Sequence, residues 1–193
     1  PTGRKQPDSM AKAASRANAG TVAPPYFDGF DTEEALADFT IIDSNNDDNT
    51  WEYFAGDNNS YVKYGYSSAN KADDWLITPA IRVEKGKAYV VKFKARSNIT
   101  YYMERLEVKY GKGNTAAAMT HELLPATDLA GEGFVEYSKE IQATEDGTLH
   151  IGFHAISDAN RYSLDLDDIS VDVGLASTAP DAVDDLVATA GDR

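Results

Sequence analysis

The chain has 193 residues, a length sufficient for one domain with a full core plus flanking segments. Its formal net charge is −14. Its 18 basic residues against 32 acidic ones exclude the basic surface that a nucleic-acid partner requires. It has no cysteine, so disulfides, thiolate metal sites and cysteine nucleophiles are excluded.

Residues 1–25 have few large apolar side chains and carry Pro or Gly at both ends, a composition that predicts a linker. The first ten residues lack the apolar centre of a signal peptide, and no apolar run approaches the roughly 20 residues needed to span a bilayer. We therefore expect no membrane insertion of this segment, and a chain cut out of a longer protein.

Residues 26–173 consist of short runs rich in Val, Ile, Tyr and Phe, separated by clusters of Gly, Asn and Asp. This pattern predicts an all-β fold, an antiparallel sandwich or jelly roll. In residues 88–97 the alternation places Val91, Phe93 and Ala95 on one face of a strand. Its other face is basic and carries Lys92, Lys94 and Arg96.

An acidic loop interrupts the first apolar run and has oxygen-bearing side chains at four alternate positions: Asp43, Asn45, Asp47 and Asn49. In an extended chain such side chains share one side, where they could bind calcium. An EF-hand is excluded, because that loop needs Gly at its sixth position and Glu at its twelfth, which here are Asp48 and Phe54. Asn and Asp are also common turn residues, so a polar turn and a calcium site both stay open.

The last apolar run, "LDLDDISV" at 164–171, contains three carboxylates. Strict alternation would place Asp168 on the face of Leu166, and Asp167 on the face of Ile169. A carboxylate held against apolar neighbours is costly unless it is paired or binds a metal. Residues 174–193 follow as a predicted linker and the start of a further domain.

Aromatic residues are numerous, and seven of them could form a platform for sugar rings: Trp51, Tyr53, Tyr61, Tyr64, Tyr66, Tyr101 and Tyr102. Ordinary packing is the competing explanation for most of them, and Trp75 is predicted to lie in the core. His150 and His154 are four residues apart on a strand, about 13 Å, which is too far for one metal. The segment beginning at His121 resembles a zinc-protease motif, but Pro125 replaces the second ligand.

Seven segments carry a family resemblance: 25–32 "PYFDGFDT", the acidic loop ending in Trp51, 73–83 "DDWLITPAIRV", 89–97 "YVVKFKARS", 106–111 "LEVKYG", 149–155 "LHIGFHA" and 162–171 "YSLDLDDISV". In this order they resemble the cleaved-adhesin modules, also called choice-of-anchor J modules, of anaerobic bacteria and of the haemagglutinin-adhesin regions of gingipains. The tail 179–192 looks like the first strand of a fibronectin type III domain. The resemblance implies a jelly roll related to carbohydrate-binding modules and MAM domains, in an extracellular protein of several domains.

The resemblance also implies a structural calcium ion where the first and last strands meet. The residues it implies as ligands are Asp31, Asp167 and Asp168, aided by Asp57. Hydrogen bonding of these carboxylates to a Lys, an Arg or a backbone amide is the alternative.

We therefore expect a non-catalytic adhesion module at the cell surface, associated with the outer membrane or secreted. Its partner would be a glycan or a protein of the host or matrix, contacted by the Tyr and Trp loops or by the basic face of residues 92–96. Two alternatives stay open: an accessory carbohydrate-binding module of a secreted hydrolase or protease, and a passive structural spacer. No nucleophile elbow or phosphate-binding loop points to catalysis.

Overall fold

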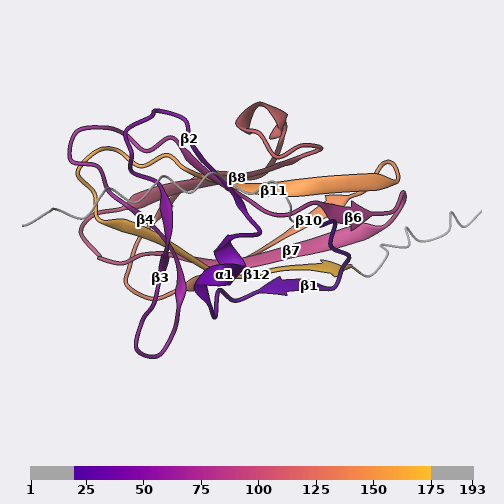
Figure 1. Ribbon diagram of the computed structural model, residues 1–193, viewed down its shortest axis with the longest axis horizontal. Coiled ribbons are helices and arrows are strands. Elements are labelled where there is room, and N and C mark those ends of the chain that lie inside the picture. Colours follow the sequence, from indigo (N-terminus) through magenta and orange to yellow (C-terminus); the bar gives the residue numbers. More distant parts are fainter. Residues whose placement is uncertain (1–19, 175–193) are drawn as a thin grey trace, which may run out of the picture.

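The computed structural model describes residues 20–174, which form two antiparallel sheets packed face to face (Figure 1). The predicted all-β sandwich is confirmed. Its first strand begins at Tyr26 and its last strand ends at Val173. The predicted linker at 1–25 lies outside the described residues up to position 19. The predicted linker and fibronectin type III strand near the C-terminus lie outside them beyond Gly174.

The first sheet, called sheet I here, has the strand order β10-β7-β12-β4-β3, with β1 also paired to β12. Its strands are β1 (Tyr26–Asp28), β3 (Trp51–Phe54), β4 (Tyr61–Gly65), β7 (Ala88–Ser97), β10 (Val135–Gln142) and β12 (Ser163–Val173). Strand β12 lies at its centre, because β7 pairs with one edge and β4 and β1 follow one another along the other edge.

The second sheet, sheet II, has the order β2-β5-β11-β8-β9, with β6 also paired to β11. Its strands are β2 (Thr40–Asp43), β5 (Asp74–Ile77), β6 (Ile81–Val83), β8 (Glu104–Gly111), β9 (His121–Leu129) and β11 (Gly147–Ala155). Two short helical turns connect strands, α1 (Glu33–Leu36) and the 3-10 turn η1 (Ala116–Ala118). Val22, in the predicted linker, also belongs to the fold, because it forms a parallel bridge with Ile81.

The core lies between the sheets and follows the predicted alternation. Val91, Phe93 and Ala95 of β7 are buried and face the interior. The Phe93 ring meets the Phe153 ring of sheet II edge-on, with centroids 5.1 Å apart. Full burial of a side chain of this size contributes roughly 1.5–3 kcal/mol, so this contact helps to hold the two sheets together.

The outer face of sheet I is basic, as predicted, but its cations are engaged within the sheet. Lys94 Nζ lies 2.6 Å from Asp168 Oδ2, and Arg96 Nε donates to Asp165 Oδ2 at 2.8 Å. Arg96 also lies over the ring of Phe134. Strand pairing places carboxylates of β12 beside Arg96 and Lys94, which offsets their charge, and contact of this face with a partner stays a prediction.

Strand β12 departs from the predicted strict alternation at Asp168. Its pairing with β7 shifts register between Asp167 and Ser170, and Asp168 has a left-handed backbone with φ 49°. The extra residue forms a β-bulge, which returns the following apolar residues to the interior. Leu166 and Ile169 are therefore both fully buried, and Asp168 points outward.

Candidate functional site

Of the calcium ligands implied for the chain ends, Asp167 and Asp168 of β12 are engaged by other contacts. Asp167 Oδ2 accepts from Asn59 Nδ2 at 2.8 Å, and its Oδ1 accepts from the Asp168 amide at 2.8 Å. Asp168 is paired with Lys94, and both Asp31 and Asp57 are exposed. The structure therefore shows the hydrogen-bonded alternative at this place, and calcium there stays a prediction.

The acidic loop at 43–50 forms a polar turn bonded to its own backbone. The carboxylate of Asp43 accepts from the amides of Asp47 at 3.3 Å and Asp48 at 3.0 Å. The side-chain oxygens of Asn45 and Asp47 accept from amides two residues further on. The turn alternative is thus observed for this loop, but a turn does not account for all of its polar atoms.

Five buried side-chain oxygens at this end of the sandwich make no hydrogen bond of standard geometry among the described residues: Ser44 Oγ, Asp47 Oδ2, Thr50 Oγ1, Tyr64 Oη and Asp74 Oδ1. Thr50 nevertheless lies close enough to Asp74, and Asn49 to Tyr64, to favour the ionised forms of Asp74 and Tyr64. We call these five oxygens the polar nest. Asp74 is its centre, because it is fully buried and pairs in register with Asp43 on the neighbouring strand. Its other carboxylate oxygen accepts from the Asp73 amide at 3.1 Å.

Burial and the nearby charges of Asp43 and Asp47 raise the pKa of Asp74 from 3.8 to about 7. Burial and the charge of Asp74 likewise raise the pKa of the Tyr64 hydroxyl. An unpartnered buried carboxylate oxygen costs free energy that a cation could recover. No sequence pattern indicated that Asp74 belongs to this site, because only strand pairing brings it opposite Asp43.

The seven predicted sugar-platform residues do not lie together. Trp51, Tyr61 and Tyr64 are only 2%, 6% and 1% exposed, so their predicted role in binding is wrong. They pack against other aromatic rings, and Trp51 Nε1 also donates to the Asp74 carbonyl at 3.1 Å. Tyr53 is half-buried beside α1, where its hydroxyl donates to the Asp31 carbonyl at 3.4 Å.

The other three predicted tyrosines are exposed at the end of the sandwich that carries the acidic loop. Together with two residues that the sequence analysis missed they form what we call the tyrosine end: Tyr66, Tyr101, Tyr102, Met103 and Tyr162. Tyr101 is the most exposed, at 87%. Large apolar side chains that project from loops into solvent in this way are typical of contact surfaces.

Hydrogen bonds join the loops of the tyrosine end to one another. The Tyr66 amide donates to the Tyr162 carbonyl at 3.1 Å, which links the loops after β4 and β11. The Tyr162 amide donates to Glu104 Oε1 at 2.6 Å, and Ser97 Oγ donates to the Tyr102 carbonyl at 2.6 Å. The loops after β4, β7 and β11 are thus held side by side.

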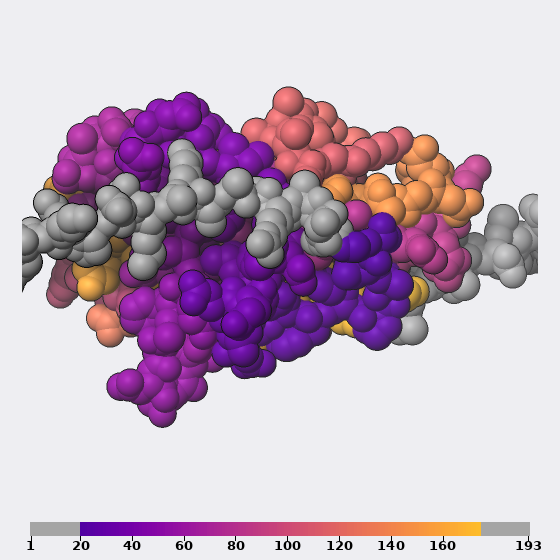
Figure 2. Space-filling model, viewed as in Figure 1, coloured from indigo at the N-terminus to yellow at the C-terminus, as the bar shows by residue number. Residues whose placement is uncertain are grey.

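The acidic loop supports the loop that carries Tyr66. Ser44 N donates to the Asp73 carbonyl at 3.0 Å, Asn45 Nδ2 donates to the Lys71 carbonyl at 2.7 Å, and Asn49 Nδ2 donates to the Gly65 carbonyl. In the space-filling view the violet and magenta segments of these loops form one bulge at the upper left (Figure 2). A change in the conformation of the acidic loop would therefore move the segment that carries Tyr66.

His154 packs on the outer face of sheet II. Its ring stacks on Trp75 with centroids 4.0 Å apart, and its two nitrogens lie 2.7 Å from Glu107 and Asp73. Burial opposes ionisation of Glu107, but hydrogen bonds from His154 and Lys109 outweigh it and lower its pKa. Both ring nitrogens are engaged, so this histidine is a packing residue.

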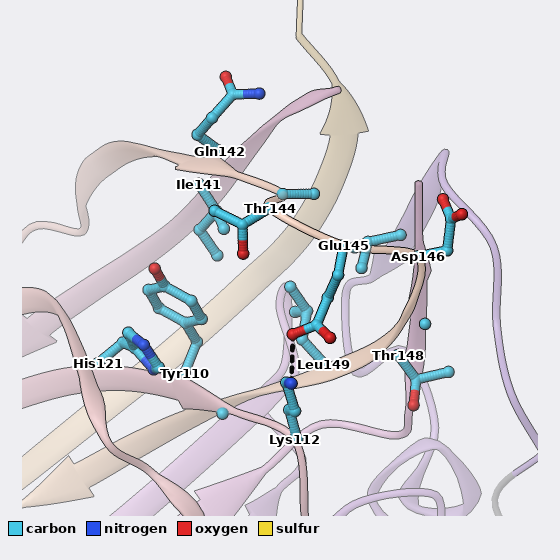
Figure 3. Close-up of a pocket in the computed structure, with 14 residues that line it drawn as sticks. Tyr110, Lys112, His121, Ile141, Gln142, Thr144, Glu145, Asp146, Thr148 and Leu149 are labelled. Carbon is cyan, nitrogen blue, oxygen red and sulfur yellow. Dashed lines mark ion pairs between the residues drawn. The ribbon is translucent and has the colours of Figure 1, made fainter. Parts of the chain in front are cut away.

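A concave site lies at the end of the sandwich away from the tyrosine end, with a cavity volume of about 640 Å³ (Figure 3). We call it the edge groove. Tyr110 and His121 form one wall, with ring centroids 4.9 Å apart, and Ile141 and Leu149 form the apolar floor. None of the residues predicted for binding lines it. The sequence analysis missed this site because no pattern indicated that the β10–β11 turn meets β8 and β9.

Among residues 20–174 no three Asp, Glu or His side chains are grouped so that they could hold a metal ion by themselves. A calcium ion at the polar nest would therefore also need hydroxyl or amide oxygens. No helix within these residues is long and apolar enough to cross a membrane.

The two packed antiparallel sheets define a jelly-roll module, which carries the tyrosine end and the edge groove. Its fold is that of cleaved adhesin domains of Lys-gingipain from Porphyromonas gingivalis, as the predicted resemblance implied. The K1 domain superposes with a TM-score of 0.61 at 18% identity, covering 78% of this chain and 98% of that one. The K3 domain gives 0.61 at 19% identity, covering 76% and 95%.

Carbohydrate-binding modules share this fold as well. The CBM22-1 xylan-binding domain of Paenibacillus barcinonensis Xyn10C superposes with a TM-score of 0.55 at 8% identity, covering 77% of this chain and 92% of that one. No protein-family model matches the sequence, and no curated protein matches it. At these identities the comparisons establish the fold, while ligands and partners have to be argued from the residues.

Proposed function

We propose that residues 26–173 form a non-catalytic adhesion module of an extracellular or cell-surface protein, which binds a glycan or a protein of the host or matrix through the tyrosine end. The observation that carries this proposal is the exposure of four tyrosines and a methionine on three adjoining loops. Tyrosine provides a large rigid surface with a polar tip, which suits both sugar rings and protein surfaces.

Calcium is the proposed structural cofactor, and the orphaned oxygens of the polar nest fit it better than the chain-end carboxylates do. Asp74 and Asp47 would supply charge, and Ser44 and Thr50 would supply neutral oxygens. When bound, the ion would compensate the repulsion among these carboxylates. The acidic loop is hydrogen-bonded to the segment that leads into Tyr66, so the same ion would also stiffen the tyrosine end.

The test compares the wild-type protein with the triple variant Tyr66→Ser, Tyr102→Ser, Tyr162→Ser on a glycan array and on immobilised matrix proteins, with and without calcium. We expect binding to one class of surface that weakens at least about tenfold in the triple variant, since several anchors are lost. Each replaced side chain is at least 44% exposed, so the fold should survive. Binding that is unchanged in the triple variant would refute the tyrosine end as the contact surface.

The accessory carbohydrate-binding module is a second candidate, favoured by the fold shared with a xylan-binding domain. It is indicated if one polysaccharide binds and matrix proteins do not. Variants at Trp51 or Tyr64 are unsuitable for this test, because both side chains belong to the core. Failure to bind any surface would favour the passive spacer.

A further inference from the structure

The edge groove is a second concave surface, separate from the tyrosine end. Strand β8 begins beside the tyrosine end at Glu104 and ends in the groove at Gly111. An eight-residue strand spans roughly 25 Å, so no single small ligand could reach both places. The groove opens where the edge of sheet I, at the end of β10, faces β8 and β9 of sheet II.

The lining of the groove combines an aromatic wall, an apolar floor and a polar rim. In Figure 3 the Tyr110 ring faces the space below Ile141, with the His121 ring beside it. The polar rim consists of Lys112, Gln142, Thr144, Glu145, Asp146 and Thr148. A pyranose ring has matching chemistry, because its faces are apolar C–H surfaces and its edges carry hydroxyl groups.

The charges on the rim leave no free cation for an anionic ligand. Lys112 is paired with Glu145, as the dashed line in Figure 3 shows. Asp146 accepts a hydrogen bond from the Lys85 amide at 2.7 Å, so it stays part of the rim. Two carboxylates against one paired ammonium group repel sulfated and carboxylated sugars. Uncharged hydroxyl groups meet no such penalty.

We infer that the edge groove binds an uncharged saccharide, one ring of which lies against the Tyr110 and His121 pair while its hydroxyl groups bond to the rim. The volume of about 640 Å³ lies within the range of roughly 300–1,000 Å³ that is usual for small-ligand sites. The inference goes beyond the proposed function, because the groove and the tyrosine end share none of the residues named for them. A module with both sites could hold a neutral glycan and a second surface at once.

The test is a titration of the isotope-labelled chain followed by backbone amide NMR. The probes are the neutral disaccharides cellobiose, xylobiose, lactose and maltose and one sulfated disaccharide, each to about 20 mM, which populates a site of millimolar affinity. We expect one or more of the neutral disaccharides to shift the amides of Gly111, Lys112, Thr144 and Gly147. His121→Ala should raise the Kd roughly threefold to tenfold, the effect of losing one aromatic contact.

Phe27→Ser is the matched control, since it removes an exposed aromatic ring that belongs to neither the groove nor the tyrosine end, and it should leave the Kd in the groove unchanged. His121 is exposed, so its replacement should not unfold the chain. Three results would overturn the inference: no shift around the groove with any neutral probe, an equal Kd in His121→Ala, or tighter binding of the sulfated probe there. Shifts confined to the loops of Tyr66 and Tyr101 would overturn it too, while supporting the proposed function.

Discussion

Replacement of Asp74 by Asn tests whether the polar nest is a cation site. Asn keeps the size of the side chain and can accept the Asp73 amide, but it cannot carry a negative charge. In the metal-free wild type the carboxylate is fully buried beside Asp43 and Asp47, and its pKa is raised from 3.8 to about 7. Asp74→Asn removes this source of repulsion.

The pKa sets the sign and the size of the expected effect. A raised pKa means that the folded, metal-free chain holds the proton more tightly than the unfolded chain does. The contribution of protonated Asp74 to the free energy of unfolding is therefore fully present below about pH 4 and is lost as the pH rises to about 7 and beyond. A difference of about three pH units at 1.36 kcal/mol each corresponds to a loss of about 4 kcal/mol, and relaxation of the loop would reduce it.

The assay is urea unfolding followed by the fluorescence of Trp51 and Trp75, in calcium-stripped buffer between pH 4.5 and 8.5 and again with calcium. Without calcium, Asp74→Asn should be more stable than the wild type by about 2–4 kcal/mol at pH 8, and by no more than about 1 kcal/mol at pH 4.5. With saturating calcium the order should reverse, because only the wild type gains the binding free energy.

The comparison between the two proteins is essential, because burial also raises the pKa of Asp165, Glu104 and Asp167. Those groups change the pH dependence of the free energy of unfolding equally in the wild type and in Asp74→Asn. Their contribution therefore cancels in the difference between the two proteins. Asp168→Asn is the control for the chain-end site. Equal pH slopes in wild type and Asp74→Asn would refute the reasoning about the nest, and calcium stabilisation lost only in Asp168→Asn would move the ion to the chain ends.

Two further changes test the packing. Arg96→Ala should lower the free energy of unfolding in urea by about 3–5 kcal/mol, because it leaves the fully buried Asp165 without its ion-pair partner. The double variant Arg96→Ala, Asp165→Leu should recover much of this loss, and no recovery would contradict the explanation. Gly111→Ala should lower the free energy of unfolding by more than about 3 kcal/mol, since its new methyl group would overlap the Ala118 carbonyl. Gly133→Ala, whose methyl group meets nothing within 4 Å, should change it by less than about 0.5 kcal/mol.

Periodicity in the sequence predicted the sandwich because it reports which side chains are buried. Residues 89–97 are the clear example, with Phe93 inside and Lys94 outside as the alternation requires. The same rule failed in β12, because one left-handed residue, Asp168, shifts the faces of everything that follows. Aspartate tolerates this conformation better than most residues, but its presence alone does not indicate a bulge.

The site was less predictable because it depends on pairing between distant segments. Alternate spacing singled out Asp43 and Asp47, yet the fully buried carboxylate of the nest, Asp74, comes from another strand. Aromatic residue type singled out both Tyr64 and Tyr66, although the strand ends between them and sends one into the core and the other into solvent. The edge groove had no local signal, since the turn between β10 and β11 creates it together with the earlier strands β8 and β9.

The distribution of charge explains why contacts should concentrate at the ends of the sandwich rather than on its faces. On sheet I, Arg96 and Lys94 are paired with carboxylates of the neighbouring strand, and on sheet II the carboxylate of Glu107 is shared by Lys109 and His154. Faces neutralised in this way offer little to a charged partner. Loops at a rigid end, in contrast, can present unpaired apolar rings without disturbing the sheets. A strand separates the tyrosine end from the edge groove, so under the two proposals each site would bind its ligand without blocking the other.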